Sequence, residues 1–143
     1  NASSISLNTK DTFAFNAPDG TKEISEDDLT AGHWLSDWDQ AMSLAKATHK
    51  IVMVDFMASW CGPCKALDKQ SFHTEAFKQE TKNIILVKID IDQQPALAQK
   101  YGVEAIPNVQ FIDEKGVVVH KFLGLIPDSE VIQNIRTAKS KRP

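Results

Sequence analysis

Both cysteines of this 143-residue chain lie in one short stretch, FMASWCGPCK at residues 56–65. Only a glycine and a proline separate Cys61 from Cys64. If Gly62 and Pro63 begin a helix, the two cysteine side chains stand on the same helix face. This spacing places their Cα atoms within the about 4.4–6.8 Å that a disulfide bond needs. The pair can therefore form and break a disulfide while the rest of the fold stays in place.

Other uses of the two cysteines are disfavoured. A structural disulfide that closes a loop of about four residues removes only roughly 2 kcal/mol of unfolded-state entropy. A structural zinc site needs four ligands, and the histidines at positions 33, 49, 73 and 120 lack the paired spacing of a zinc finger. Covalent haem attachment requires a histidine directly after the second cysteine, but Lys65 follows Cys64, so this use is excluded. The sequence thus predicts thiol–disulfide exchange, with no metal and no bound cofactor.

A helix that starts at the cysteines would also activate one of them. Unpaired backbone N–H groups and the positive end of the helix dipole stabilise an anion at a helix start. This environment lowers the pKa of a thiol below its usual value of about 8.5. An attacking thiol works best when its pKa is close to the ambient pH. We therefore expect Cys61 to be a reactive thiolate near neutral pH.

Strands and helices alternate around the motif. Residues 51–57, IVMVDFM, form an apolar run typical of a strand that is covered on both faces. Upstream, Trp38, Ala41, Met42 and Ala45 recur at helical spacing, and Ser36 with Asp39 resembles a capping box. Downstream, two helical segments follow the cysteines, with a break expected near His73. Residues 84–91, IILVKIDI, predict a second strand.

The C-terminal third predicts a different order of elements. A short helix at 95–101 stops at Gly102, and strands at 108–113 and 117–123 flank the turn EKG. Asp128 is expected to cap a last helix. The order is βαβ followed by ββα, which favours a layered α/β or α+β domain.

Composition sets further limits. The chain is 42% hydrophobic and 24% charged, which suits one soluble globular domain, and its net charge of −3 argues against a nucleic-acid partner. No apolar run reaches the 18 or more residues of a membrane span. Residues 1–32 are polar and contain the turn signal Pro-Asp-Gly, so we interpret them as an N-terminal extension or linker, with a short hairpin as an option. Residues 33–143 are the predicted domain.

Over about residues 34–139 the sequence resembles the thioredoxin family. The resemblance rests on VMVDFMASWCGPCK, VKIDID, KYGVEAIPNVQFID and a glycine at 124. The flanking segments WDQAMSLAKATHK and LDKQSFHTEAFKQ look most like the C-terminal thioredoxin-like domain of DsbD-type thiol:disulfide interchange proteins and their soluble relatives. The resemblance implies a thioredoxin fold, in which helices flank a central mixed sheet.

The resemblance also implies roles for individual residues. Cys61 would be the nucleophile that forms a mixed disulfide with the substrate, and Cys64 would attack that bond to release it. Asp55 lies inside an apolar strand, where burial raises the pKa of a carboxyl group, so it could take the proton of Cys64. The alternative is a solvated aspartate at an edge. Lys88 would pair with this acid, with an exposed strand residue as the alternative.

The remaining site residues are expected to bind the substrate. By resemblance these are Trp60, Gly62, Pro63, Ile106, Pro107 and Gly124. The Ile106–Pro107 bond is expected to be cis and to pack against the cysteines, although only about 5–6% of X-Pro bonds in folded proteins are cis. The backbone of Ile106 would then pair with an extended substrate segment. Met57 stands where many thioredoxins have tryptophan, so one wall of this surface is expected to differ.

These observations predict an enzyme, a monomeric protein-disulfide reductase. The alternatives are a disulfide oxidase or isomerase of the same fold, and a peptide-binding module in which the thiols are incidental. Its partners would be disulfide-bearing proteins and an upstream thiol electron donor. That donor would be a membrane thiol reductase if the chain is periplasmic or otherwise exported, and a flavin-dependent thioredoxin reductase if it is cytoplasmic.

Overall fold

The apolar run Ile51–Met57 is β2, the central strand of the sheet, in a computed structural model that describes residues 32–141. Strand β2 pairs in parallel with β3 (Ile84–Asp90) and antiparallel with β4 (Asn108–Ile112). It therefore has a hydrogen-bonded neighbour on each side and helices over both faces. Its first six residues are buried, as expected of an unbroken apolar run.

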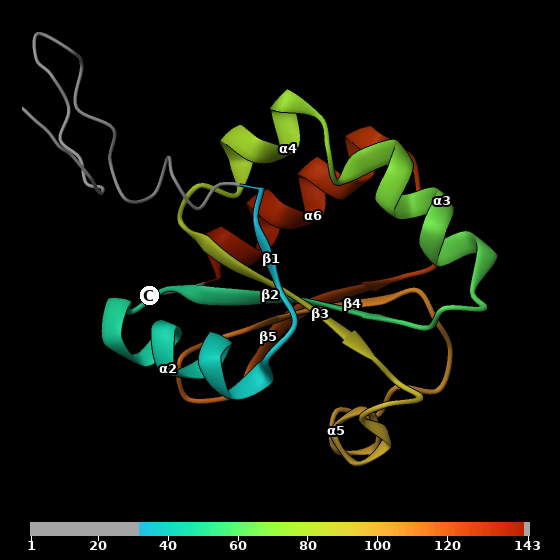
Figure 1. The fold of residues 1–143 in the computed structure, drawn as a ribbon. Helices are drawn as coiled ribbons and strands as arrows, with labels where there is room; N and C mark the ends of the chain where they lie inside the picture. The colour runs from blue at the N-terminus through green and yellow to red at the C-terminus, as the bar shows by residue number, and fades with distance from the viewer. Residues whose placement is uncertain (1–31, 142–143) are drawn as a thin grey trace, which may run out of the picture.

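Among residues 32–141, five strands form one mixed sheet in the order β1-β3-β2-β4-β5 (Figure 1). The edges are β1 (Trp34–Leu35), parallel to β3, and β5 (Val118–Leu123), antiparallel to β4. The mixed sheet flanked by helices confirms the predicted fold class. Strand β1 was not predicted, because two residues are too few to show an alternating pattern.

Helices cover both faces of the sheet (Figure 1). One layer contains α2 (Trp38–Thr48) and α5 (Pro95–Lys100), and the other contains α3 (Gly62–Ser71), α4 (Glu75–Glu80) and α6 (Asp128–Ser140). The side chains of β2 alternate between two buried clusters, with Met53 facing α3, α4 and α6 and Val54 facing α2. The break between α3 and α4 includes His73, as predicted.

Two predicted helix caps are wrong. Helix α2 is capped by Asp37, whose carboxylate accepts a hydrogen bond from the Gln40 N–H at 3.1 Å, and not by Ser36. The cap residue of α6 is Pro127, and Asp128 is the first helical residue. Asp128 and Glu130 instead lie in the first turn of α6, where their negative charges interact favourably with the positive end of the helix dipole.

The predicted N-terminal extension lies outside the described residues except for Gly32, and its boundary with the domain stays a prediction. Within residues 32–141, no helix is both long and apolar enough to cross a membrane. In the same part of the chain, no group of three His, Cys, Asp or Glu side chains could hold a metal ion.

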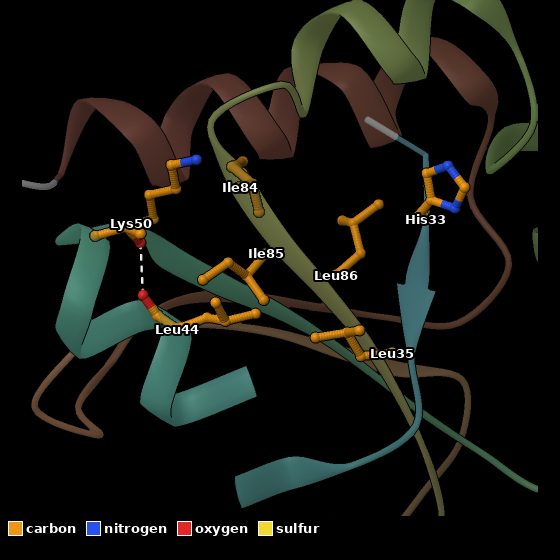
Figure 2. Close-up of a pocket in the computed structure, with 8 residues that line it drawn as sticks. His33, Leu35, Leu44, Lys50, Ile84, Ile85 and Leu86 are labelled. Atoms are coloured by element: carbon orange, nitrogen blue, oxygen red, sulfur yellow. Dashed lines mark hydrogen bonds between the residues drawn. The ribbon is translucent and has the colours of Figure 1, made fainter. Parts of the chain in front are cut away.

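An apolar cavity of about 100 Å³ lies between α2, β1 and the start of β3. Figure 2 shows Leu44 of α2 gathered with Leu35 and Ile85 at this cavity. Ile84 pairs with Ile51, at the start of β2, whereas the cysteines follow the end of β2. A strand of this length spans about 20 Å. The cavity is therefore at the far end of the sheet from the cysteines.

Candidate active site

The cysteine pair lies where β2 leads into α3. Cys61 is the N-cap residue of α3, and its Sγ accepts a hydrogen bond from the Cys64 N–H at 3.1 Å. The two sulfurs form a disulfide, with the Cα atoms 5.3 Å apart, inside the range predicted from the spacing. Gly62 and Pro63 occupy the first turn of α3 and are exposed. The backbone N–H that points at Cys61 Sγ is the kind of donor that stabilises a thiolate after reduction.

A cavity of about 150 Å³ lies behind the cysteines, under α3. Its lining residues are Asp55, Met57, Ala58, Cys64, Lys65, Asp68 and Lys88. It joins the resolving cysteine to four charged side chains, and it is large enough to hold water. The cavity therefore gives a proton leaving Cys64 a short route to a carboxylate.

Asp55 is the buried acid of this cavity. Its residue is 2% exposed, and its Oδ1 has no hydrogen-bond partner within the described part of the chain. Burial raises the pKa of Asp55 to about 7; the positive charge of Lys88 opposes this rise and the negative charge of Asp68 adds to it. The raised pKa agrees with the prediction, and the alternative of a solvated aspartate is wrong. A carboxyl group with this pKa can both accept and release a proton near neutral pH.

Lys88 lies directly opposite Asp55 in the pairing of β2 with β3, but its ion pair is with another carboxylate. The Lys88 ammonium donates a hydrogen bond to Asp68 Oδ1. It also lies 5.2 Å from the ring centroid of Trp34, in a cation–π contact. The predicted pairing of Lys88 with Asp55 is therefore corrected to an ion pair with Asp68. Asp55 is influenced by Lys88 through charge alone.

Asp68 is a member of the site that the sequence analysis missed. Its Oδ2 is 3.0 Å from Nε2 of His73, and its Oδ1 accepts from Lys88. Partial burial acts to raise the pKa of Asp68, but hydrogen bonds from Lys88 and His73, with their positive charges, hold it below the usual value. Asp68 thus stays ionised and competes with Asp55 for Lys88. Its position four residues after Cys64, on the same helix face, was the signal that could have revealed it.

The Ile106–Pro107 bond is cis, as expected from the resemblance. Ile106 is half-buried and packs against the cluster of Ala58, Cys61 and Cys64. The Pro107 carbonyl accepts a hydrogen bond from the Gly124 N–H at 2.9 Å, and Gly124 has a φ of +81°. Only glycine adopts such a φ readily, which accounts for this residue at the end of β5. Of the predicted substrate-binding residues, Ile106 thus lies beside the disulfide, and Pro107 and Gly124 are hydrogen-bonded to each other.

Trp60 lies at the outer rim of the site. Its side chain is 65% exposed, and its Nε1–H donates to Asp92 Oδ2 at 2.7 Å. This bond holds the indole in one orientation while its apolar ring faces solvent. Met57 packs against the cysteine cluster. Trp60, Gly62 and Pro63 are all exposed beside the cysteines, and their roles in substrate binding stay predictions.

The family model that matches the chain is described as thioredoxin, and it covers residues 34–137. The chain belongs to the thioredoxin family. It is 34% identical over 103 residues to thioredoxin H5 of Arabidopsis thaliana, a match that covers 72% of this chain and 84% of that protein.

Solved thioredoxin structures agree with this assignment. The long form of thioredoxin f from spinach chloroplast superposes with a TM-score of 0.65 at 26% identity, covering 80% of this chain and 93% of that one. An oxidoreductase named DsbH shares the fold, with a TM-score of 0.64 at 18% identity, over 86% of this chain and 95% of that one. Family membership and the bonded cysteine pair together make this chain a thiol–disulfide oxidoreductase that acts as a reductase.

Proposed function

We propose that the reduced chain transfers two electrons to disulfides of other proteins through Cys61 and Cys64. In the first step the Cys61 thiolate attacks one sulfur of the substrate disulfide. A bond forms between Cys61 and that sulfur, and the other substrate sulfur leaves as a thiolate. The observation that carries the proposal is the position of Cys61 at the start of α3, bonded to Cys64 one turn later.

The second step releases the substrate. Cys64 gives its proton to the Asp55 carboxylate in the shared cavity and attacks Cys61 Sγ. The Cys61–Cys64 disulfide forms, and the substrate sulfur leaves as a second thiolate. The chain ends in its oxidised form, so an external thiol donor must reduce it before the next cycle.

Insulin reduction by the Cys61→Ser variant tests the enzyme assignment. We expect loss of activity, because a serine hydroxyl cannot form the mixed disulfide. Activity that survives this substitution would contradict the role of Cys61. A wild-type chain that binds peptides beside Pro107 but does not reduce insulin would favour the other candidate, a module whose thiols are incidental. The exposed ring of Trp60 and the half-buried Ile106 support that second candidate as a binding surface.

The direction of exchange depends on the reduction potential of the cysteine pair relative to its surroundings. Equilibration with glutathione measures it. A reductase should have a potential near that of other thioredoxins, at about −270 mV, whereas a value near about −120 mV would indicate an oxidase. An isomerase is the remaining alternative of the same fold.

We further propose that the chain is exported to the periplasm and receives electrons from a membrane thiol reductase. The resemblance to DsbD-type proteins supports this location. A cytoplasmic chain would instead receive electrons from a flavin-dependent thioredoxin reductase. Immunoblotting of periplasmic and cytoplasmic fractions from the source cells separates the two, and a purely cytoplasmic signal would contradict export.

A further inference from the structure

Two amide side chains are buried on β4, on the face that packs toward α2 and α5. Asn108 is 3% exposed and Gln110 is 1% exposed, and the next residue on that face, Ile112, belongs to the apolar cluster. Gln110 Oε1 has no hydrogen-bond partner within residues 32–141. An unpaired buried oxygen lowers stability, so an apolar side chain would serve the core better at this position. The presence of glutamine at this position must therefore be explained by the amide nitrogen, Nε2.

Gln110 Nε2 makes two hydrogen bonds. It donates to the Tyr101 carbonyl at 3.0 Å and to Asn108 Oδ1 at 3.3 Å. Tyr101 is the residue at which α5 ends, and Asn108 directly follows Pro107. The segment between them, residues 102–107, carries Ile106 to the disulfide. Gln110 thus joins the two ends of this segment.

The backbone hydrogen bonds of the 102–107 segment lie at its two ends. At the far end, Pro107 is held by the Gly124 N–H at 2.9 Å. At the near end, the Val103 N–H donates to the Ala98 carbonyl at 2.9 Å. Between Val103 and Pro107 no backbone hydrogen bond to another element is present in the described residues. Apart from the packing of the Ile106 side chain on the cysteine cluster, the position of the Ile106 backbone is then set by how firmly the Tyr101 and Asn108 ends are fixed.

We propose that Gln110 is a positioning residue that holds the 102–107 segment so that the Ile106 backbone can pair with an extended protein substrate. The inference rests on the proposed reductase function and adds a determinant of substrate class. Gln110 should matter for disulfides carried on a peptide strand. It should not matter for small disulfides, which reach Cys61 without pairing with Ile106.

The test compares two substrates of the reduced chain. Rate constants are measured with insulin, a protein disulfide, and with 5,5′-dithiobis(2-nitrobenzoate), a small one. For Gln110→Met, which keeps the side-chain length but loses the amide and both of its hydrogen bonds, we expect the insulin rate to fall at least about fivefold, since the loss of one hydrogen bond alone has an effect of this size. The rate with the small disulfide should stay unchanged. If Gln110→Met does not fold, Gln110→Asn is used, because its shorter amide cannot span to Tyr101.

Ile112→Val is the matched control. It trims a buried side chain on the same face of β4 and leaves both hydrogen bonds of the Gln110 amide in place. An unchanged insulin rate in Gln110→Met would overturn the inference, as would an equal loss with both substrates or an equal loss in Ile112→Val. A wild-type chain that reduces the small disulfide but not insulin would overturn the proposed function itself. The wild-type measurement therefore tests the proposed function separately from the role of Gln110.

Discussion

Replacing Asp55 by asparagine tests whether burial beside the cysteines makes this carboxyl group costly to ionise. Asparagine has nearly the same shape but carries no charge at any pH. Asp55 lies under α3 on the central strand, where it is 2% exposed and its Oδ1 is unpartnered within the described residues. The substitution therefore removes an unfavourable charge and leaves the packing largely unchanged.

The size of the effect follows from the pKa of Asp55, which burial raises from 3.8 to about 7. A difference of about three units at about 1.36 kcal/mol each corresponds to about 4 kcal/mol. Between pH 3.8 and 7 the unfolded chain has lost a proton that the folded chain keeps. The free energy of unfolding therefore falls as the pH rises through this window, and the full cost is present above pH 7.

Urea denaturation of the oxidised protein at several pH values between 4 and 8 measures this cost. We expect Asp55→Asn to be more stable than the wild type by up to about 4 kcal/mol at pH 8, with the two converging toward pH 4. Asp39→Asn, at an exposed position of α2, is the matched control. Parallel stability curves for Asp55→Asn and the wild type would refute the argument, because they would show that Asp55 ionises as easily in the folded chain as in water.

Three further predictions concern neighbouring features and use the same denaturation assay. Asp68→Asn frees Lys88 and removes a like charge, so the pKa of Asp55 should fall and the pH-dependent loss of stability should end at a lower pH; an unchanged window would contradict this. His49→Gly should raise the free energy of unfolding by about 0.5–1 kcal/mol, because His49 has a φ of 59°, which glycine adopts more readily than histidine. A loss of stability would be inconsistent with backbone strain at this residue. Thr74→Ala should cost about 1 kcal/mol by removing the cap of α4, whereas Thr74→Ser should not.

Features that depend on neighbouring residues in the chain could be predicted from the sequence. The apolar run around Asp55 indicated both a central strand and a buried acid. The spacing of Cys61 and Cys64 indicated a disulfide at a helix start, and the structure has both. The cis bond before Pro107 followed from the resemblance alone, since most X-Pro bonds are trans.

Features that depend on how distant elements pack could not be predicted in the same way. Asp68 meets Lys88 only because α3 packs on the face of the sheet that carries the Lys88 side chain, so the predicted partner of this lysine is the wrong carboxylate. The contact of Lys88 with Trp34 requires β1, whose pairing consists of two residues. Gln110 looked like an ordinary strand residue, and its bond to the Tyr101 carbonyl appears only once α5 is packed on the sheet.

Trapping of the mixed disulfide tests the central claim most directly. Reduced Cys64→Ser protein is mixed with insulin, and the products are analysed by mass spectrometry under non-reducing conditions. We predict a covalent adduct of the chain with insulin, linked through Cys61, because the resolving thiol is missing. No adduct in Cys64→Ser, or an equal amount of adduct in Cys61→Ser through Cys64, would contradict the assignment of Cys61 as the nucleophile.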